Sequence, residues 1–434
     1  MNSSPTSRRT LVALAAVSLL GLTACSTDAA GAPDSGQPIE ITFSSYNYGT
    51  AGATGEGTQA LLDTFAAAHP EIKVVPQSVP AGEMLTKTKT DVAAGNAPDV
   101  VQLGYSKLNE AQQTLPLQSI EQIAGEEWDA HAAGIAQGPL QAGEWEGEVR
   151  SLPYTVSIPA LFYNADLFEA AGLDPASPPQ SIEEVAAAAQ AIKANGDYGV
   201  YFGAVDSAKS DYLTQSILNS AGTAIVDDDG NVLIDSPEAV NALTQVQQLT
   251  KDGLQPAVQV DDALAAFSSG ELGMFIATTA YSMNISTAAE GNFELRSTGF
   301  PTFRDGPSAP THSGSGLVVL SEDEQKQQAS WEFLKFLTSK EGYTIITEQL
   351  GYLPLRADIV DDKAYLADYF AQNTLLLPSL EQLDTVTPYR VFPGKKSNQG
   401  TVLFQDNAVE PIILRGADVE QTLKDIAERI RGLD

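Results

Sequence analysis

Cysteine and histidine are scarce in this chain. Its 434 residues contain one cysteine, Cys25, so no intramolecular disulfide can form. The three histidines, His69, His131 and His312, are far apart and lack the close spacing of a zinc site. The sequence therefore predicts no metal site, no cofactor and no catalysis by a cysteine.

Basic residues are also few. The chain has 24 Lys and Arg against 56 Asp and Glu, a formal net charge of −32. Nucleic-acid binding requires a basic surface and is excluded, and we interpret the acidity as a source of solubility. An anionic ligand would need a local cluster of the few cations. The candidates, for which surface ion pairing is the alternative role, are Arg356, Arg390, Lys395 and Lys396.

Common catalytic motifs are missing. The sequence contains no G-x-x-x-x-G-K-[ST], no H-E-x-x-H and no G-x-S-x-G. We therefore predict that the chain is not an enzyme and has no catalytic residues. A secreted carbohydrate-active hydrolase stays open as an alternative, because glycoside hydrolysis needs only two opposed carboxylates and acidic residues are abundant here.

Long hydrophobic runs are absent apart from one at the N-terminus. Arg8 and Arg9 precede an apolar run, Leu11 to Leu22, which has the length of a signal peptide and is too short to span a membrane. The run ends in Leu-Thr-Ala-Cys, which resembles a bacterial lipobox and predicts cleavage of residues 1–24 and lipidation of Cys25. An ordinary secretory signal is the alternative, and the Sec and Tat export routes both stay open.

A flexible tether follows the cysteine. Residues 25–38 are rich in Ala, Gly, Ser, Asp and Pro and have hardly any large apolar side chain, so burial cannot order them. Together with acyl chains on Cys25, this segment predicts a protein anchored by lipid at the extracellular face of the cell membrane.

The remainder, from about residue 39, is long enough for two lobes. Strands and helices alternate at its start, which indicates a parallel sheet covered by helices. The expected elements are a strand at 39–43, a helix at 58–68, a strand at 72–76, a helix at 82–94 and a strand at 99–103. Capping motifs predict that later helices begin at Ser181, Ser236 and Ser321.

Several segments resemble the family 1 extracellular solute-binding proteins of bacteria, in the order and at the spacing of that family. They are 95–100 (GNAPDV), 161–168 (LFYNADLF), 170–175 (AAGLDP), 267–274 (FSSGELGM) and 331–338 (WEFLKFLT). Three more resemble its glycerol-3-phosphate branch, namely 278–282 (TTAYS), 313–316 (SGSG) and 351–354 (GYLP). Lys395 lies near the place where that branch carries an arginine.

The resemblance implies an α/β, two-lobed periplasmic-binding-protein-like fold of type II, with a hinge of crossing strands and a ligand cleft between the lobes. It places the crossings near 157–160, 296–299 and 316–320. Lobe 1 would then comprise residues 39–158 plus 298–318, and lobe 2 residues 159–297 plus 319–434. Ligands of open α/β sheets bind beyond the carboxyl ends of strands, which agrees with such a cleft.

The resemblance also implies a function. The chain would be a monomeric substrate-binding lipoprotein of an ABC importer that captures a sugar, oligosaccharide or glycerol-3-phosphate-type ligand. Its partners would be permease subunits in the membrane and a separate cytoplasmic ATPase. A lipoprotein that presents ligand to a surface sensor is a further alternative.

Candidate ligand-binding residues follow strands or lie in loops. After the first strand come Asn47 and Tyr48 and a glycine-rich loop to Gly57, in which Glu56 can accept hydrogen bonds from sugar hydroxyls; a turn that serves only the chain path is the alternative. Tyrosines offer apolar faces to sugar C–H groups or to a quaternary ammonium, although core packing is equally compatible with each. The tyrosine candidates are Tyr105, Tyr154, Tyr281 and Tyr352. The other candidates are Asp211, Tyr212, Ser282, Gly314, Ser315, Arg356 and Lys395.

Overall fold

The computed structural model describes residues 37–205 and 211–433. The predicted signal peptide, Cys25 and nearly all of the predicted tether lie outside the described residues, so those assignments stay predictions. Within the described residues, no helix is both long enough and apolar enough to cross a membrane.

The first sheet contains the β-α-β-α-β unit expected at the start of the folded part. Its strand order is β2-β1-β3-β11-β6. The strands are β1 (Ile39–Ser45), β2 (Ile72–Ser78), β3 (Val100–Gly104), β6 (Leu152–Ser157) and β11 (Ser313–Val319). β1 is parallel to β2 and β3, because helices α1 (Ala53–Ala68) and α2 (Met84–Ala93) return the chain between them. β11 is antiparallel to both β3 and β6.

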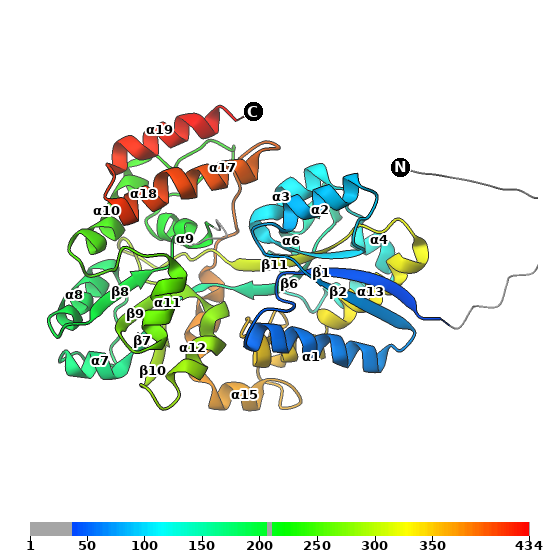
Figure 1. The fold of residues 1–434 in the computed structure, drawn as a ribbon, viewed down its shortest axis with the longest axis horizontal. Coiled ribbons are helices and arrows are strands. Elements are labelled where there is room, and N and C mark those ends of the chain that lie inside the picture. The colour runs from blue at the N-terminus through cyan, green and yellow to red at the C-terminus, as the bar shows by residue number, and fades with distance from the viewer. Residues whose placement is uncertain (1–36, 206–210, 434) are drawn as a thin grey trace, which may run out of the picture. The chain divides into compact units, whose positions relative to one another are not determined.

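The second sheet contains strands from the middle of the chain, in the order β10-β7-β9-β8. They are β7 (Pro159–Asn164), β8 (Tyr198–Phe202), β9 (Leu272–Thr278) and β10 (Leu295–Thr298). β7 is antiparallel to β9 and β10, whereas β8 is parallel to β9. Figure 1 shows the two groups of strands as separate sheets, each with its own helices.

Short and peripheral elements complete the fold. The other helices are α3 (Tyr105–Thr114), α4 (Ile120–Ala124), α5 (Trp128–Ala132), α6 (Gln137–Gln141), α7 (Ala165–Ala170), α8 (Ile182–Lys193), α9 (Tyr212–Ser220), α10 (Pro237–Lys251), α11 (Val260–Ser268), α12 (Ser282–Ala289), α13 (Glu324–Leu337), α14 (Lys340–Ile345), α15 (Ala367–Gln372), α16 (Leu377–Glu381), α17 (Ser397–Phe404), α18 (Glu410–Arg415) and α19 (Val419–Arg431). A two-stranded hairpin consists of β4 (Glu144–Trp145) and β5 (Glu148–Val149). The 3-10 turns are Gly125–Glu127, Thr279–Tyr281, Ala357–Ile359, Thr374–Leu376 and Gln382–Thr385, and the π-helical turns are Ile346–Leu350 and Gln405–Val409.

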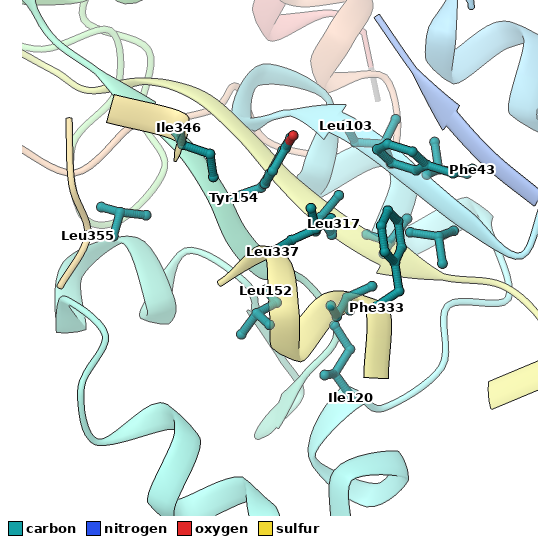
Figure 2. Close-up of a cluster of buried hydrophobic side chains, with 14 of the residues drawn as sticks. Phe43, Leu103, Ile120, Leu152, Tyr154, Leu317, Phe333, Leu337, Ile346 and Leu355 are labelled. Carbon is teal, nitrogen blue, oxygen red and sulfur yellow. The ribbon is translucent and has the colours of Figure 1, made fainter. Parts of the chain in front are cut away.

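The core of the first sheet extends far into the C-terminal part of the chain. The ring of Phe333 on α13 packs edge-on against Phe43 of β1 at 5.2 Å (Figure 2). It also packs edge-on against Phe65 of α1 at 5.0 Å. The same core continues as far as Leu376. Residues 324–376 thus pack with the first sheet, and their expected assignment to the second lobe was wrong. The boundaries of the lobes otherwise stay a prediction.

The core of the second sheet contains the last helices of the chain. Phe404, Ile412 and Ile426, from α17, α18 and α19, are fully or almost fully buried and pack in one cluster with Val200 of β8. The C-terminal end of the chain therefore packs with the second sheet.

The chain passes between the sheets three times. The first crossing is short: β6 ends at Ser157 and β7 begins at Pro159, with only Ile158 between them. This agrees with the expected crossing at 157–160. The other two expected crossings overlap strands β10 and β11. The chain instead crosses between Phe303 of the second core and the start of β11 at Ser313, and again at 377–391, between the core residues Leu376 and Phe392.

Two helix starts differ from the expected ones. α1 begins at Ala53 instead of residue 58, so Glu56 and Gly57 belong to its first turns. A Cβ at Gly57 would lie 2.4 Å from Cδ1 of Leu350. Glycine is therefore needed at this position for close packing, and not for the flexibility of a loop. α13 is capped by Asp323, whose Oδ1 accepts hydrogen bonds from the N–H groups of residues 325 and 326, and not by Ser321. The expected caps Ser181 and Ser236 are present.

Candidate functional site

A cavity of about 590 Å³ lies where strands of both sheets end. Its wall includes the residues that directly follow β1. It also includes Gly104, which is the last residue of β3, and Thr278, which is the last residue of β9. This is the position at which open α/β sheets bind ligands, and the volume falls within the roughly 300–1,000 Å³ of small-molecule sites.

A hydrogen bond joins the two sheets at the wall of this cavity. Thr278 of the second sheet donates from Oγ1 to Oγ of Ser157, the last residue of β6 in the first sheet, at 2.7 Å. Both side chains line the cavity, so residues of the two sheets meet at this point.

Tyrosine dominates the cavity wall. Six tyrosines line it, namely Tyr46, Tyr105, Tyr212, Tyr281, Tyr352 and Tyr389. Burial raises the pKa of the phenols of Tyr46, Tyr105 and Tyr352, so these groups stay protonated and neutral at physiological pH. Such rings offer apolar faces and hydroxyl tips to a ligand.

A buried hydrogen-bond chain fixes the loop that follows β1. Oγ of Ser45 donates to Oε1 of Gln102 at 2.6 Å and accepts from the backbone N–H of Asn47 at 3.1 Å. Nε2 of Gln102 donates in turn to Oγ of Ser315, which also bonds Oγ1 of Thr155 at 2.7 Å. Because these side chains use their polar atoms on one another, they position Asn47 and do not face a ligand.

Among the described residues of the cavity wall, two carry a buried side-chain polar atom without a hydrogen-bond partner. These atoms are the amide nitrogen Nδ2 of Asn47 and the hydroxyl of Tyr105, both on side chains at most 5% exposed. A buried polar group without a partner costs about 1–3 kcal/mol. A ligand that supplies hydrogen-bond partners to both atoms would remove this cost.

Charged groups are few at the wall. Among the described residues that line it, Lys107 and Asp261 are the only charged side chains, and Nζ of Lys107 donates to Oδ1 of Asn398. Asp211 lies behind the wall, where Tyr389 and Gln215 donate to its carboxylate. Burial raises the pKa of Asp211, although these two hydrogen bonds lower it.

Six of the predicted site residues line the cavity. They are Asn47, Tyr105, Tyr212, Tyr281, Gly314 and Tyr352. Gly314 has φ 119°, and a Cβ there would lie 2.0 Å from the carbonyl oxygen of Thr155, so only glycine fits between the strands. Tyr46, Lys107 and Tyr389 line the cavity too and were not among the predicted residues.

The remaining predicted residues do not line it. Tyr154 is fully buried in the first core (Figure 2), and Ser282 is buried with its hydroxyl 3.4 Å from the carbonyl oxygen of Gly351. Tyr48 packs against the first core from outside, and Glu56 is exposed on α1. Asp211 and Ser315 are held by the internal hydrogen bonds described above.

Arg356 and Lys395, the two candidate cations among the predicted site residues, also lie elsewhere. Arg356 is 7% exposed and donates from Nε to the carbonyl oxygen of Thr338 at 2.7 Å and from Nη2 to that of His131 at 3.0 Å. Its guanidinium therefore joins two segments of the first core. Lys395 is exposed and does not line the cavity. Within the described part of the chain, no group of three or more His, Cys, Asp or Glu side chains could hold a metal.

Similar proteins share this architecture. A binding protein of Brucella abortus (strain 2308) is 26% identical over 421 residues, which cover 96% of each chain. The sn-glycerol-3-phosphate-binding periplasmic protein of Escherichia coli (strain K12) is 24% identical over 339 residues, 74% of this chain and 76% of that protein.

Solved structures have the same two-lobed fold. The cyclic α-maltosyl-1,6-maltose-binding protein of Arthrobacter globiformis superposes with a TM-score of 0.74 at 23% identity and covers 91% of this chain and 98% of its own. UgpB of Mycobacterium tuberculosis, solved with glycerophosphocholine, superposes with a TM-score of 0.79 at 23% identity and the same coverage. The expected type of fold is thereby confirmed.

The family model of the bacterial extracellular solute-binding proteins matches residues 49–344, more than half of the chain. The match spans all of the first sheet except β1, the whole second sheet and most of the cavity wall. The expected family is confirmed: this chain belongs to the bacterial extracellular solute-binding proteins.

Proposed function

We propose that the chain captures a neutral carbohydrate, a sugar or short oligosaccharide, for an ABC importer made of membrane permease subunits and a separate ATPase. One observation carries the choice of ligand: among the described residues of the cavity wall, six are tyrosines and Lys107 alone is a cation, and Lys107 already donates to Asn398. The sugar-binding neighbour from Arthrobacter globiformis supports the same class of ligand.

The chemistry of the wall suits a sugar. Ring faces of tyrosine pack against the C–H groups of pyranose rings. Hydroxyl and amide side chains, including Ser157, Asn284 and Ser313, supply donors and acceptors for sugar hydroxyls, and Asn47 has an unused donor. A mostly apolar wall with a few directed polar groups is typical of small-molecule sites.

A phosphate monoester suits the wall less well. Recognition of phosphate commonly uses Arg or several cations, whereas Lys107 is the only cation among the described residues of the wall. Asp261 in the wall and Asp211 behind it add negative charge. Glycerophosphocholine is the second candidate, because tyrosine faces also bind quaternary ammonium groups and the mycobacterial neighbour was solved with that ligand.

Calorimetric titration of the purified protein tests the proposal. The ligands are maltose, maltotriose, glycerol 3-phosphate and glycerophosphocholine, each at about 0.15 M salt to hold electrostatic screening constant. Saturable binding of a sugar supports the proposal, and binding confined to the two phosphorus compounds overturns it. Release of glucose during incubation would favour the hydrolase alternative.

Substitution of one wall tyrosine gives a second test. Tyr281→Ala should weaken sugar binding at least about tenfold, the equivalent of 1.4 kcal/mol. The matched control is Tyr198→Ala, because Tyr198 is 49% exposed on β8 and does not line the cavity. Equal affinities of the two variants would contradict the assignment of the site.

Anchoring by lipid belongs to the same proposal. Export, cleavage after residue 24 and acylation of Cys25 would hold a monomeric receptor beside its permease at the extracellular face. Labelling of growing cells with radioactive fatty acid should mark the wild-type protein and not Cys25→Ser. Equal labelling of both would remove the anchor from the proposal.

A further inference from the structure

A second, smaller cavity adjoins the first. It measures about 240 Å³ and lies between one face of α3, the β4–β5 hairpin and the crossing segment that carries Val391. Tyr105 and Tyr389 line both cavities, so the two hollows share a wall. A ligand held in the first cavity would have to extend past these two rings to reach the second.

An unusual tryptophan lines this second cavity. Of the three tryptophans, Trp128 and Trp331 pack together in the first core with their ring centres 6.5 Å apart. Trp145 is half-buried and belongs to none of the hydrophobic clusters of the described chain. No core packing therefore accounts for its indole, which is left as an aromatic platform at the edge of the cavity.

The hairpin fixes this platform. Trp145 pairs with Glu148 across the two strands. The turn residues Glu146 and Gly147 have φ 54° and 82°, the left-handed conformation of a two-residue hairpin turn. A non-glycine residue with positive φ is uncommon, so the chain tolerates a strained residue to present Trp145 at this place.

Polar side chains line the same cavity as Trp145. The hydroxyl of Tyr105 has no partner, and Tyr105 is 5% exposed. Glu144 is exposed beside Trp145, and Gln112 donates to the carbonyl oxygen of Gly143 at 3.3 Å, which leaves its own amide oxygen as an acceptor. An aromatic face flanked by a carboxylate and an amide offers both stacking and hydroxyl recognition.

The size of the hollow indicates what occupies it. At about 240 Å³ it is smaller than the roughly 300–1,000 Å³ of independent ligand sites. We propose that it is a subsite for one further unit of an oligosaccharide whose other end is held in the 590 Å³ cavity, with that unit stacked on Trp145. This subsite rests on the proposed function, because it lengthens the ligand that the first cavity binds.

Titration with ligands of increasing length tests the subsite. Di-, tri- and tetrasaccharides of one linkage are titrated into the purified wild-type protein, Trp145→Ala and Trp145→Phe. The wild type should bind the longer sugars more tightly than the disaccharide. Trp145→Ala should lose about fivefold to tenfold in affinity for the longer sugars only, the equivalent of about 1–1.4 kcal/mol for one aromatic contact. Trp145→Phe keeps a ring and should retain most of the gain.

Tryptophan fluorescence supplies a readout that a purely structural role would not move. Longer sugars, but not the disaccharide, should change the emission of the wild type, and the change should vanish in Trp145→Phe although that variant still binds them. Two results would overturn the subsite while the proposed function stands. Trp145→Ala could weaken the binding of sugars of every length equally, or its affinity could still rise with sugar length as in the wild type. Failure of every sugar to bind the folded wild type would overturn both.

Discussion

The phenol of Tyr389 donates a hydrogen bond to Oδ1 of Asp211, a carboxylate that is 0% exposed. Gln215 donates to the other oxygen of Asp211 and forms two further bonds with the backbone of Arg390, at 2.9 and 3.1 Å. Because Tyr389 lines the cavity and packs against both large cores, this arrangement ties the third crossing segment to α9. Asp211 thus holds the ring of Tyr389 in place at the cavity wall.

Tyr389→Phe should lower the free energy of unfolding by about 1.5–3 kcal/mol, because a buried carboxylate loses one of its two side-chain donors. Urea unfolding at pH 7 measures the loss. In a double-mutant cycle, Asp211→Asn and Tyr389→Phe together should cost about 1 kcal/mol less than the sum of the single changes. Strict additivity would show that the bond stabilises nothing.

The same substitution should change the pH dependence. Burial raises the pKa of Asp211, so the native state holds its proton more tightly than the unfolded state does. The contribution of Asp211 to stability therefore falls as the pH rises from about 4 to the raised folded pKa, and stays low above it. Loss of the Tyr389 bond raises that pKa further, and the fall should then extend to higher pH.

His312 should change the stability with pH in the direction opposite to Asp211. Its ring is 5% exposed, lies 4.7 Å from Tyr105 in a T-shaped contact and has an unpartnered Nδ1; burial lowers its pKa to about 4. The native state then binds fewer protons than the unfolded state, whose histidine pKa is about 6.5. Stability is thus full above about pH 6.5 and is lost as the pH falls towards 4.

His312→Gln should reduce this acid sensitivity. Between pH 7 and 4.5 the wild type should lose about 1–3 kcal/mol more than the variant in urea unfolding. Some sensitivity should persist, because burial also lowers the pKa of His131 to about 4. Identical profiles of wild type and variant would show that His312 does not titrate in this range.

Arg356→Ala tests the structural role assigned to Arg356. Loss of its hydrogen bonds to two backbone carbonyls should cost about 2–4 kcal/mol of stability while ligand affinity changes less than twofold. The control is Lys395→Ala, which removes an exposed cation and should change stability by less than about 0.5 kcal/mol. A large loss of affinity in Arg356→Ala at unchanged stability would restore its role as a ligand residue.

Gly57→Ala tests the packing of α1. Helix propensity alone predicts a gain of about 1 kcal/mol, but the added Cβ would lie 2.4 Å from Leu350, so we expect a net loss of about 1–3 kcal/mol. Ala67→Gly, at an exposed site of the same helix, measures propensity alone and should cost at most about 1 kcal/mol. A stabilised Gly57→Ala would show that α1 can move away.

The parts of the fold that local patterns specify could be predicted. Strand β1 was recognisable because its apolar residues alternate with polar ones, and strand β3 because it is a short, mostly apolar run that is buried along nearly its whole length. The placement of residues 324–376 could not be predicted. It depends on where the third crossing occurs, and no local pattern marks a crossing in the segment 377–391, which consists of a short helix, a 3-10 turn and irregular chain.

The site shows the same division. Tyr105, Tyr281 and Asn47 were found because they follow strands whose ends converge on one edge. Tyr389 was missed, since it lies on an irregular segment without periodicity. Arg356 was misplaced for a physical reason: a cation in an acidic chain suggests an anionic ligand, yet its partners are neutral carbonyl oxygens distant in sequence.

Strand β11 determines when the first sheet can form. It lies between β3 and β6 and bonds to both, and Ser315 within it meets Gln102 across 213 positions of sequence. During synthesis β6 therefore has no strand to pair with in its sheet until residue 319 has been made. By then the ribosome has already synthesised every strand of the second sheet. Contacts of such separation close slowly. The lobe that begins the folded protein is thus completed late, and an emerging chain stays open for most of its translation.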